Sequence, residues 1–185
     1  MRKIFIAVSA IAMLASCSSV KNTVKNKALI ETTIDLTNVV DDKVQVSINP
    51  QKITENTIVY NIPAIVPGTY AMSNFGQFVT NFKAYDYDGN ELTVEKLDTN
   101  SWQINDAVKM DKLSYWVDDT FDSEINHGIY VMAGTNIEKN KNFLLNLPGF
   151  VGYFKGKKET PYTITVKHPE NLVETTSLIN KNVTK

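Results

Sequence analysis

The sequence predicts an all-β domain, an antiparallel β-sandwich-like fold with one short helical turn, over residues 28–185. From Ala28 onward, apolar and polar residues alternate with a period of two, as expected for strands that bury one face. About ten such segments follow one another at a spacing of roughly 8–12 residues. Helical periodicity occurs in one segment only, and this combination is typical of sandwiches and related folds.

The first residues predict a secretory signal of the lipoprotein type. Residues 1–16 begin with two cations and continue with an apolar run, which is shorter than the about 20 residues that span a bilayer. The run ends in a lipobox and its cysteine: Leu14, Ala15, Ser16 and Cys17. We expect a signal helix that is cleaved before Cys17, which then carries diacylglycerol. The alternative is an ordinary signal peptide that contains a cysteine by chance.

Residues 17–27 are predicted to form a flexible tether, because they are polar and rich in Lys and Asn. Two or more acyl chains anchor a protein stably, so the domain would lie at a membrane surface without entering it. Ser18 gives no inner-membrane retention signal. We therefore expect an exported protein of the bacterial cell envelope, lipid-anchored on the outer membrane.

Cys17 is the only cysteine, so the domain is predicted to fold without a disulfide or a thiolate zinc ligand. A domain of this size buries roughly 70% of its unfolded surface, which is sufficient for a core without such staples. The net charge of −1 provides no basic surface, and nucleic acid is not an expected partner.

Individual strands are located by alternation and by β-branched and aromatic content. Alternation is clearest at residues 30–36 and 43–48. Asp88-Gly89 between two β-prone runs predicts a hairpin over residues 85–92, since glycine adopts the positive φ that the turn needs. Further strands are predicted at residues 57–62, 102–105, 113–118, 129–132, 143–147 and 162–167.

The one helical segment is predicted within residues 73–82. Ser73 is placed to cap its first turn, and four apolar residues recur at helical spacing: Phe75, Phe78, Val79 and Phe82. We expect one or two helical turns that run into a strand.

The sequence contains no catalytic motif that we can identify. The zinc-peptidase pattern His-Glu-x-x-His is absent, and the two histidines, His127 and His168, have no second nitrogen ligand beside them. We expect them in a surface loop and at a strand end. Nucleophile-elbow and phosphate-loop patterns are also absent. The chain alone is therefore predicted to be no enzyme and to carry no cofactor or metal.

An acidic cluster is the candidate cation site, formed by Asp118, Asp119, Asp122 and Glu124. Calcium binds several carboxylate and carbonyl oxygens on one loop, but this spacing does not match the EF-hand pattern. A calcium site and a solvated turn remain open as alternatives. Residues 86–90 resemble a calcium loop faintly, and the hairpin is the stronger interpretation there.

A glycine-rich segment and a group of aromatic residues are candidate contact surfaces. Gly149 and Gly152 do not have the spacing of a dinucleotide-binding loop, and we expect a loop that exposes Tyr153 and Phe154. Four aromatic residues could stack on sugars or peptides: Trp102, Trp116, Tyr85 and Tyr87. For Trp102, alternation favours a position in the core.

The turn Pro67, Gly68, Thr69 and Tyr70, with residues 71–75 and 79–89 after it, resembles the N-terminal domain of the glycyl aminopeptidase family, zinc metallopeptidase family sixty-one. Members typically show a Pro-Gly-Ser-Tyr turn, a strand ending in a hairpin, a Trp-containing strand and a Leu-x-Tyr-x-Val strand. Trp102 and residues 113–117 are similar to the last two, and the resemblance extends over about residues 30–178.

The resemblance implies a β-rich domain that packs against a zinc catalytic domain, in enzymes that prefer small N-terminal residues such as Gly and Ala. Many members have a PDZ domain after the catalytic domain. The family's His-Glu-x-x-His helix lies downstream of the matched region, so no catalytic or metal residue is carried over to this chain. Zinc is implied only for the missing catalytic domain.

The leading hypothesis is a non-catalytic N-terminal accessory domain of a lipid-anchored zinc aminopeptidase, as a fragment or a truncated form, that helps to shape the substrate cleft. Its partners would be the membrane, a peptidase catalytic domain in cis or in trans, and peptide substrate. The alternative is a free-standing envelope lipoprotein that binds peptide or glycan through residues 149–156 or 67–75. A purely structural envelope protein is the third hypothesis.

Overall fold

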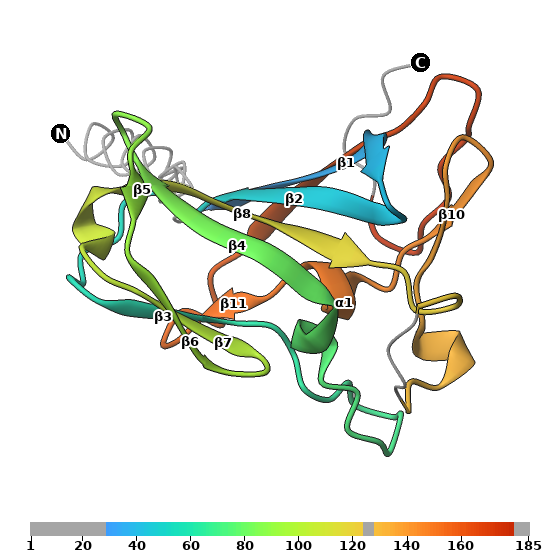
Figure 1. Cartoon of the computed structure of the whole chain (residues 1–185), viewed down its shortest axis with the longest axis horizontal. Coiled ribbons are helices and arrows are strands. Elements are labelled where there is room, and N and C mark those ends of the chain that lie inside the picture. Colours follow the sequence, from blue (N-terminus) through green and yellow to red (C-terminus); the bar gives the residue numbers. More distant parts are fainter. Residues whose placement is uncertain (1–28, 124–127, 180–185) are drawn as a thin grey trace, which may run out of the picture.

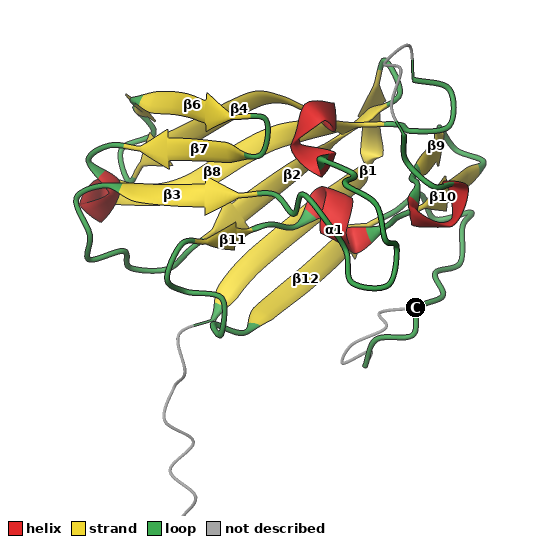
Figure 2. Cartoon of the chain, turned by 90° about the horizontal axis from the view of Figure 1, so that it is seen from below, coloured by secondary structure: helices red, strands yellow, loops and turns green. Residues whose placement is uncertain are grey.

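The computed structural model of the chain describes residues 29–123 and 128–179, which form two packed β-sheets and a small hairpin (Figures 1 and 2). The signal peptide with its lipobox, Cys17 and the tether lie outside the described residues, as do Glu124 and His127. Within the described ranges, no helix is long and apolar enough to cross a membrane.

The larger sheet has six strands in the order β12-β1-β2-β8-β4-β5. Alternation at residues 30–36, 43–48, 113–118 and 162–167 correctly predicts four of them. The bounds in chain order are β1 (Ile30–Val40), β2 (Lys43–Asn49), β4 (Val79–Asp86), β5 (Glu91–Leu92), β8 (Met110–Asp118) and β12 (Tyr162–Lys167).

The smaller sheet has four strands in the order β11-β3-β7-β6, and β9 and β10 form a separate hairpin. The bounds are β3 (Ile58–Asn61), β6 (Val94–Asp98), β7 (Ser101–Ile104), β11 (Tyr153–Phe154), β9 (Asn136–Glu138) and β10 (Asn142–Leu144). The short helices are η1 (Phe75–Phe78), η2 (Ala107–Lys109), η3 (Val131–Ala133) and α1 (Leu147–Phe150).

The core lies between the two sheets, where inward-facing side chains of both meet. Val46 and Tyr115 on the larger sheet and Tyr60 and Ile104 on the smaller one are completely buried. Each fully buried large apolar side chain contributes about 1.5–3 kcal/mol relative to exposure. The Phe82 ring, on β4, stacks on the Tyr115 ring, with a 5.5 Å centroid distance and 5° between the planes. The fold is therefore all-β and sandwich-like, as predicted.

A chain of hydrogen bonds crosses this core. The Gly152 amide donates to the Tyr60 hydroxyl (2.7 Å), and the Tyr115 hydroxyl donates to the Phe150 carbonyl (2.5 Å). The two hydroxyls are 3.0 Å apart. Because the Phe150 carbonyl can only accept, it takes the single proton of the Tyr115 hydroxyl, so Tyr60 donates to Tyr115. Burial raises the pKa of both hydroxyls, so both stay neutral. The chain fixes residues 150–152 against both sheets.

One strand pairing differs from the antiparallel pattern that the sequence predicts. β1 and β12 are parallel, with Ile30 beside Tyr162 and Asp35 beside Lys167, whereas the other pairings are antiparallel. The prediction was incomplete because alternation identifies a strand but not its neighbour. Since the two strands run the same way, the chain leaves β12 toward the end at which β1 finishes.

The helical prediction is confirmed in its outline and wrong in its cap. η1 is one short turn and runs directly into β4, as expected. Asn74, in the left-handed conformation, occupies the cap position and makes no side-chain capping bond. Ser73 is instead buried, and its amide donates to the Ala64 carbonyl.

The predicted strand at residues 129–132 is wrong, because the chain forms η3 there. β-branched and aromatic residues favour strands only where a neighbouring strand pairs with them, and η3 has no such partner among the described pairings. The prediction at residues 143–147 is half right, since β10 ends at Leu144 and α1 begins at Leu147.

The predicted hairpin over residues 85–92 is confirmed by the pairing of Tyr85 with Glu91. Gly89 has the expected positive φ of 83°. The Asp86 carboxylate accepts hydrogen bonds from the amides of Asp88 and Asn90 (3.0 and 2.8 Å) and from the Asn90 side chain (3.1 Å). These contacts lower the pKa of Asp86 and explain the acidic turn without a cation.

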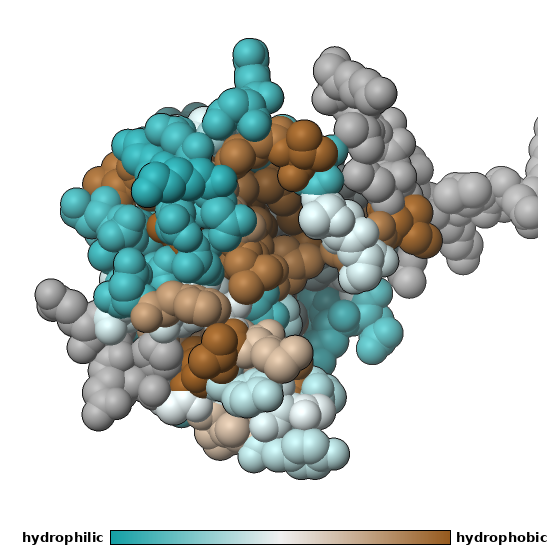
Figure 3. All heavy atoms as spheres, turned by 90° about the vertical axis from the view of Figure 1, so that its right-hand side faces the viewer, coloured by the Kyte–Doolittle hydropathy of each residue, from teal (hydrophilic) through white to brown (hydrophobic). Residues whose placement is uncertain are grey.

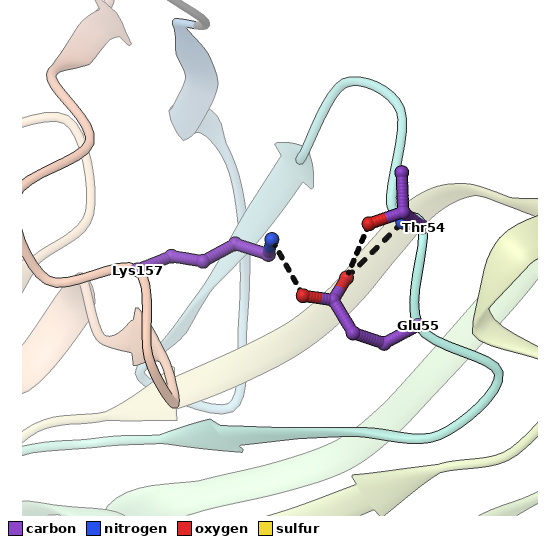
Figure 4. Close-up of polar contacts among 3 residues, drawn as sticks. All are labelled: Thr54, Glu55 and Lys157. Carbon is purple, nitrogen blue, oxygen red and sulfur yellow. Dashed lines mark hydrogen bonds and ion pairs between the residues drawn. The ribbon is translucent and has the colours of Figure 1, made fainter.

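Two loops that are far apart in sequence are joined by an ion pair (Figure 4). The Lys157 ammonium lies 2.9 Å from one carboxylate oxygen of Glu55, and the other oxygen accepts from the Thr54 amide and hydroxyl. The hydrogen bond from Lys157, together with backbone donors, lowers the pKa of Glu55 to about 2. The pair connects the loop before β3 to the segment after β11.

Candidate functional site

The turn of Pro67, Gly68, Thr69 and Tyr70 lies between β3 and η1, where it projects from the end of the sandwich (Figure 1). The Val66 carbonyl accepts hydrogen bonds from the Thr69 amide and hydroxyl (3.2 and 2.8 Å), and Gly68 has a φ of 93°. Tyr70 has a φ of 52° and is 98% exposed. Bulky residues rarely adopt this left-handed conformation, and such strain is concentrated at contact and ligand sites.

The base of this turn is closed by backbone hydrogen bonds. The Ala64 carbonyl accepts from the amides of Ser73 (2.8 Å) and Asn74 (2.9 Å), and the Pro63 carbonyl accepts from Phe75. The turn therefore holds Tyr70 and its exposed neighbour Met72 on a fixed support.

A second group of exposed apolar side chains lies on and before η3: Tyr130, Val131 and Met132. The Ala133 and Gly134 amides donate to the carbonyls of Tyr130 (2.7 Å) and Val131 (3.0 Å), which closes this turn. The half-exposed Phe121 ring lies against Gly134, where a Cβ would come within 2.9 Å of it. The Asn146 side chain, next to α1, donates to the Ala133 carbonyl.

Strand register places both groups at one end of the molecule. Val79, at the start of β4, pairs with Val117, near the end of β8, so η1 and the turn before it lie at the end where β8 finishes. The chain passes from β8 to Phe121, and the Asp119 amide donates to the Asp42 carbonyl in the β1–β2 turn. Figures 1 and 2 agree on this placement.

We call this surface the apolar end face, defined by six exposed residues: Tyr70, Met72, Phe121, Tyr130, Val131 and Met132. Figure 3 looks onto this end of the molecule, and hydrophobic residues gather in the middle of the view. Of these six, sequence reasoning singled out Tyr70, and Met72 lies within the candidate binding segment of residues 67–75. Tyr130, Val131 and Met132 could have been suspected from the apolar run at residues 129–133, set between Gly128 and Gly134, but that run was assigned to a strand.

The glycine-rich segment is not the exposed loop that the sequence predicts. Phe154 is completely buried because β11 pairs with β3, with Phe154 opposite Tyr60. Gly149 and Gly152 are also buried, the former against the Phe75 ring and the latter against the Asn61 carbonyl. Tyr153 is half-buried, with the Lys158 ammonium 4.8 Å from its ring centroid. The prediction that Phe154 is exposed is therefore wrong.

Asp119 of the acidic cluster does not lie in a solvated turn, whereas Asp122 is exposed and Asp118 is half-buried. Asp119 is buried, and its carboxylate accepts hydrogen bonds from the backbone amides of Phe121 and Ile137. Burial raises the pKa of this carboxyl. Asp118 points elsewhere and pairs with Lys43 at 3.5 Å. The Asp119 oxygens tie the segment after β8 to β9.

The described residues do not offer a zinc site. Groups of three or more His, Cys, Asp and Glu side chains that could hold a metal are absent from residues 29–123 and 128–179. His168 lies after β12 as predicted, with Nδ1 3.0 Å from the Pro169 carbonyl and Nε2 3.3 Å from a Glu174 oxygen. The side chains present therefore do not fit a catalytic zinc ion.

The aromatic residues do not form an open stacking platform. Trp102 is 4% exposed, as the core prediction expects, with Phe82 stacked at 4.8 Å and the Lys96 ammonium 5.3 Å from its ring. The Lys112 ammonium lies 5.2 Å from the Tyr85 ring. Among the described residues, the sandwich therefore presents a group of exposed apolar side chains at one end.

This β-domain architecture agrees with what the chain is similar to. The family model described as the peptidase M61 N-terminal domain matches residues 31–185, so the chain belongs to this family through that domain. A second model, the prokaryotic membrane lipoprotein lipid attachment site, matches residues 1–18. A search of curated proteins gave no match.

A solved structure has a similar fold. It is described as the crystal structure of an aminopeptidase N family protein from Idiomarina loihiensis, with a TM-score of 0.58 and 17% sequence identity. The match covers 76% of this chain and 22% of that chain. The chain thus spans about a fifth of the length of this structural relative.

Proposed function

We propose that the chain is the N-terminal accessory domain of a lipid-anchored zinc aminopeptidase, which it helps to present at the bacterial outer membrane. The observation that carries this proposal is the match of residues 31–185 to the N-terminal domain of a peptidase family. The described residues supply a rigid β-scaffold and an apolar end face but no metal-binding group. Zinc and the hydrolytic groups would then belong to a catalytic domain outside this chain.

In this role the domain would form one wall of the substrate cleft, beside the catalytic domain. The match of residues 1–18 to a lipid attachment site supports Cys17 as the membrane anchor. Replacement of Cys17 by Ser should move the protein from the membrane fraction to the soluble fraction. A variant that stays in the membrane fraction would contradict lipid anchoring.

Enzyme activity of the native protein tests the proposal. Protein captured from membranes with an antibody against residues 28–185 should release N-terminal Gly or Ala from peptides, and a zinc chelator should abolish this activity. The purified chain of residues 28–185 should have no activity. An inactive native protein, or an active purified chain, would contradict the proposal.

The second candidate is a free-standing envelope lipoprotein that binds peptide or glycan. The exposure of Tyr70 on a closed turn favours it, because a fixed, strained aromatic side chain is suited to ligand contact. Replacing Tyr70 and Tyr153 by Ala should then weaken the retention of peptides or glycans without unfolding the domain. Unchanged retention would exclude this assignment.

A further inference from the structure

The apolar end face consists of large exposed apolar side chains at one end of the molecule, most of them on two closed turns. Met132 is 83% exposed and Tyr70 is 98% exposed, although both are carried by turns that backbone hydrogen bonds close. Large exposed apolar side chains that gather in one area mark interaction surfaces, whereas single ones do not. A preorganised patch loses little conformational entropy when it is covered.

The position of the face in the topology indicates what covers it. β1 has 11 residues and spans about 35 Å at roughly 3.3 Å per residue, which separates its start at Ile30 from this end. The chain that leads to Cys17 joins at Ile30, so the face lies at the end away from the attachment of the tether.

The segment that follows β12 lies at the same end as the face. β12 runs parallel to β1, and after it the Asn171 side chain donates to the Asn140 carbonyl in the β9–β10 turn at 3.4 Å. Figures 1 and 2 show residues 168–179 at this end. Val173 and Ile179 in this segment are 91% and 90% exposed. A domain joined after this segment would start at the same end of the molecule as the apolar end face, on the side of the β9–β10 hairpin.

We propose that the apolar end face is the surface on which the catalytic domain of the same polypeptide docks, with the segment of residues 169–179 covered at the same interface. This inference rests on the proposed function, which supplies the partner. Tyr70 would be the central anchor, because aromatic side chains held in place contribute most to such interfaces.

Hydrogen exchange measured on the native protein and on the chain of residues 28–185 tests the inference. Peptides that cover residues 64–73 and 128–134 should exchange about tenfold or more slowly in the native protein, since docking buries their amides. Peptides that cover the β4–β5 turn, at the opposite end, should exchange equally in both. Equal exchange of all these peptides would overturn the inference.

A charge on the face should open the interface without unfolding the domain. Met132→Asp in the native protein should increase the rate of proteolytic cleavage after residue 169 by about tenfold, because docking no longer protects the segment. Tyr87→Asp is the matched control, since Tyr87 is 64% exposed on the β4–β5 turn. Equal cleavage of the two variants would overturn the inference.

Two other occupants would also overturn it. If the slow exchange appears in the chain of residues 28–185 as its concentration rises, the face binds a second copy. If it appears only on addition of phosphatidylethanolamine and phosphatidylglycerol vesicles, the face binds lipid. The mass of the native protein separates these failures from failure of the proposed function. A mass near 20.8 kDa would show that no catalytic domain is attached, so the proposed function itself would fail. A larger mass together with either outcome above would overturn this inference alone.

Discussion

Two buried tyrosine hydroxyls connect the sheets through one directed series of hydrogen bonds. Tyr115→Phe removes the donor to the Phe150 carbonyl and the acceptor for Tyr60, while the ring packing is kept. Leaving buried polar groups unpaired costs about 1–3 kcal/mol each, and we expect the free energy of unfolding to fall by about 2 kcal/mol. Urea unfolding of residues 28–185 measures this. A change no larger than that of Tyr87→Phe would contradict the assignment.

The Glu55–Lys157 pair predicts a pH dependence. The pKa of Glu55 is lowered in the folded state, so its charged form stabilises the fold above the unfolded pKa of about 4.3. This stability is lost as the pH falls toward about 2. Glu55→Gln should destabilise the domain by about 0.2–1 kcal/mol at pH 7, as partly exposed pairs do.

The measurement is the difference in unfolding free energy between the wild type and Glu55→Gln from pH 7 to pH 2. The difference should shrink between about pH 4 and pH 2, the window set by the two pKa values. Glu95→Gln, on the exposed edge strand β6, is the control. A difference that is independent of pH would show that the ion pair does not cause it.

Among the elements, β11 is short but closely fitted to its neighbour. A Cβ at Gly152 would lie 2.0 Å from the Asn61 carbonyl oxygen, which is backbone and cannot move without opening the β3–β11 pairing. Gly152→Ala should therefore destabilise residues 28–185 by about 2–3 kcal/mol, which lowers the thermal midpoint by roughly 4–12 °C. Gly128→Ala should change it little, because Gly128 has open space around it. Similar midpoints for both variants would contradict this packing.

Alternation predicted the strands that bury one face, such as β1 and β2, because burial imposes the period of two. It did not find β6, an edge strand rich in charged residues with little burial. It also could not show that Phe154 is buried, since this depends on a pairing with β3, about 95 residues earlier in the chain. The apolar end face was not predicted for the same reason, because only the register of β4 on β8 places its two parts at the same end of the molecule.

The whole molecule is a β-sandwich with its two chain exits at opposite ends. The chain enters the domain at the start of β1, and the segment after β12 leaves at the end that carries the apolar end face, because these strands are parallel. This arrangement suits a domain that stands between a membrane anchor and a catalytic domain. The aromatic anchor Tyr70 was predictable from the motif, but its strained conformation and its neighbours were not.

The central claim is that this chain is the accessory part of a larger peptidase. Its most direct test is the mass of the native protein, measured by blotting membrane fractions with an antibody against residues 28–185. We expect a band several times larger than the 20.8 kDa chain, in the membrane fraction. A band near 20.8 kDa would contradict the claim and leave the binding lipoprotein as the function of this chain.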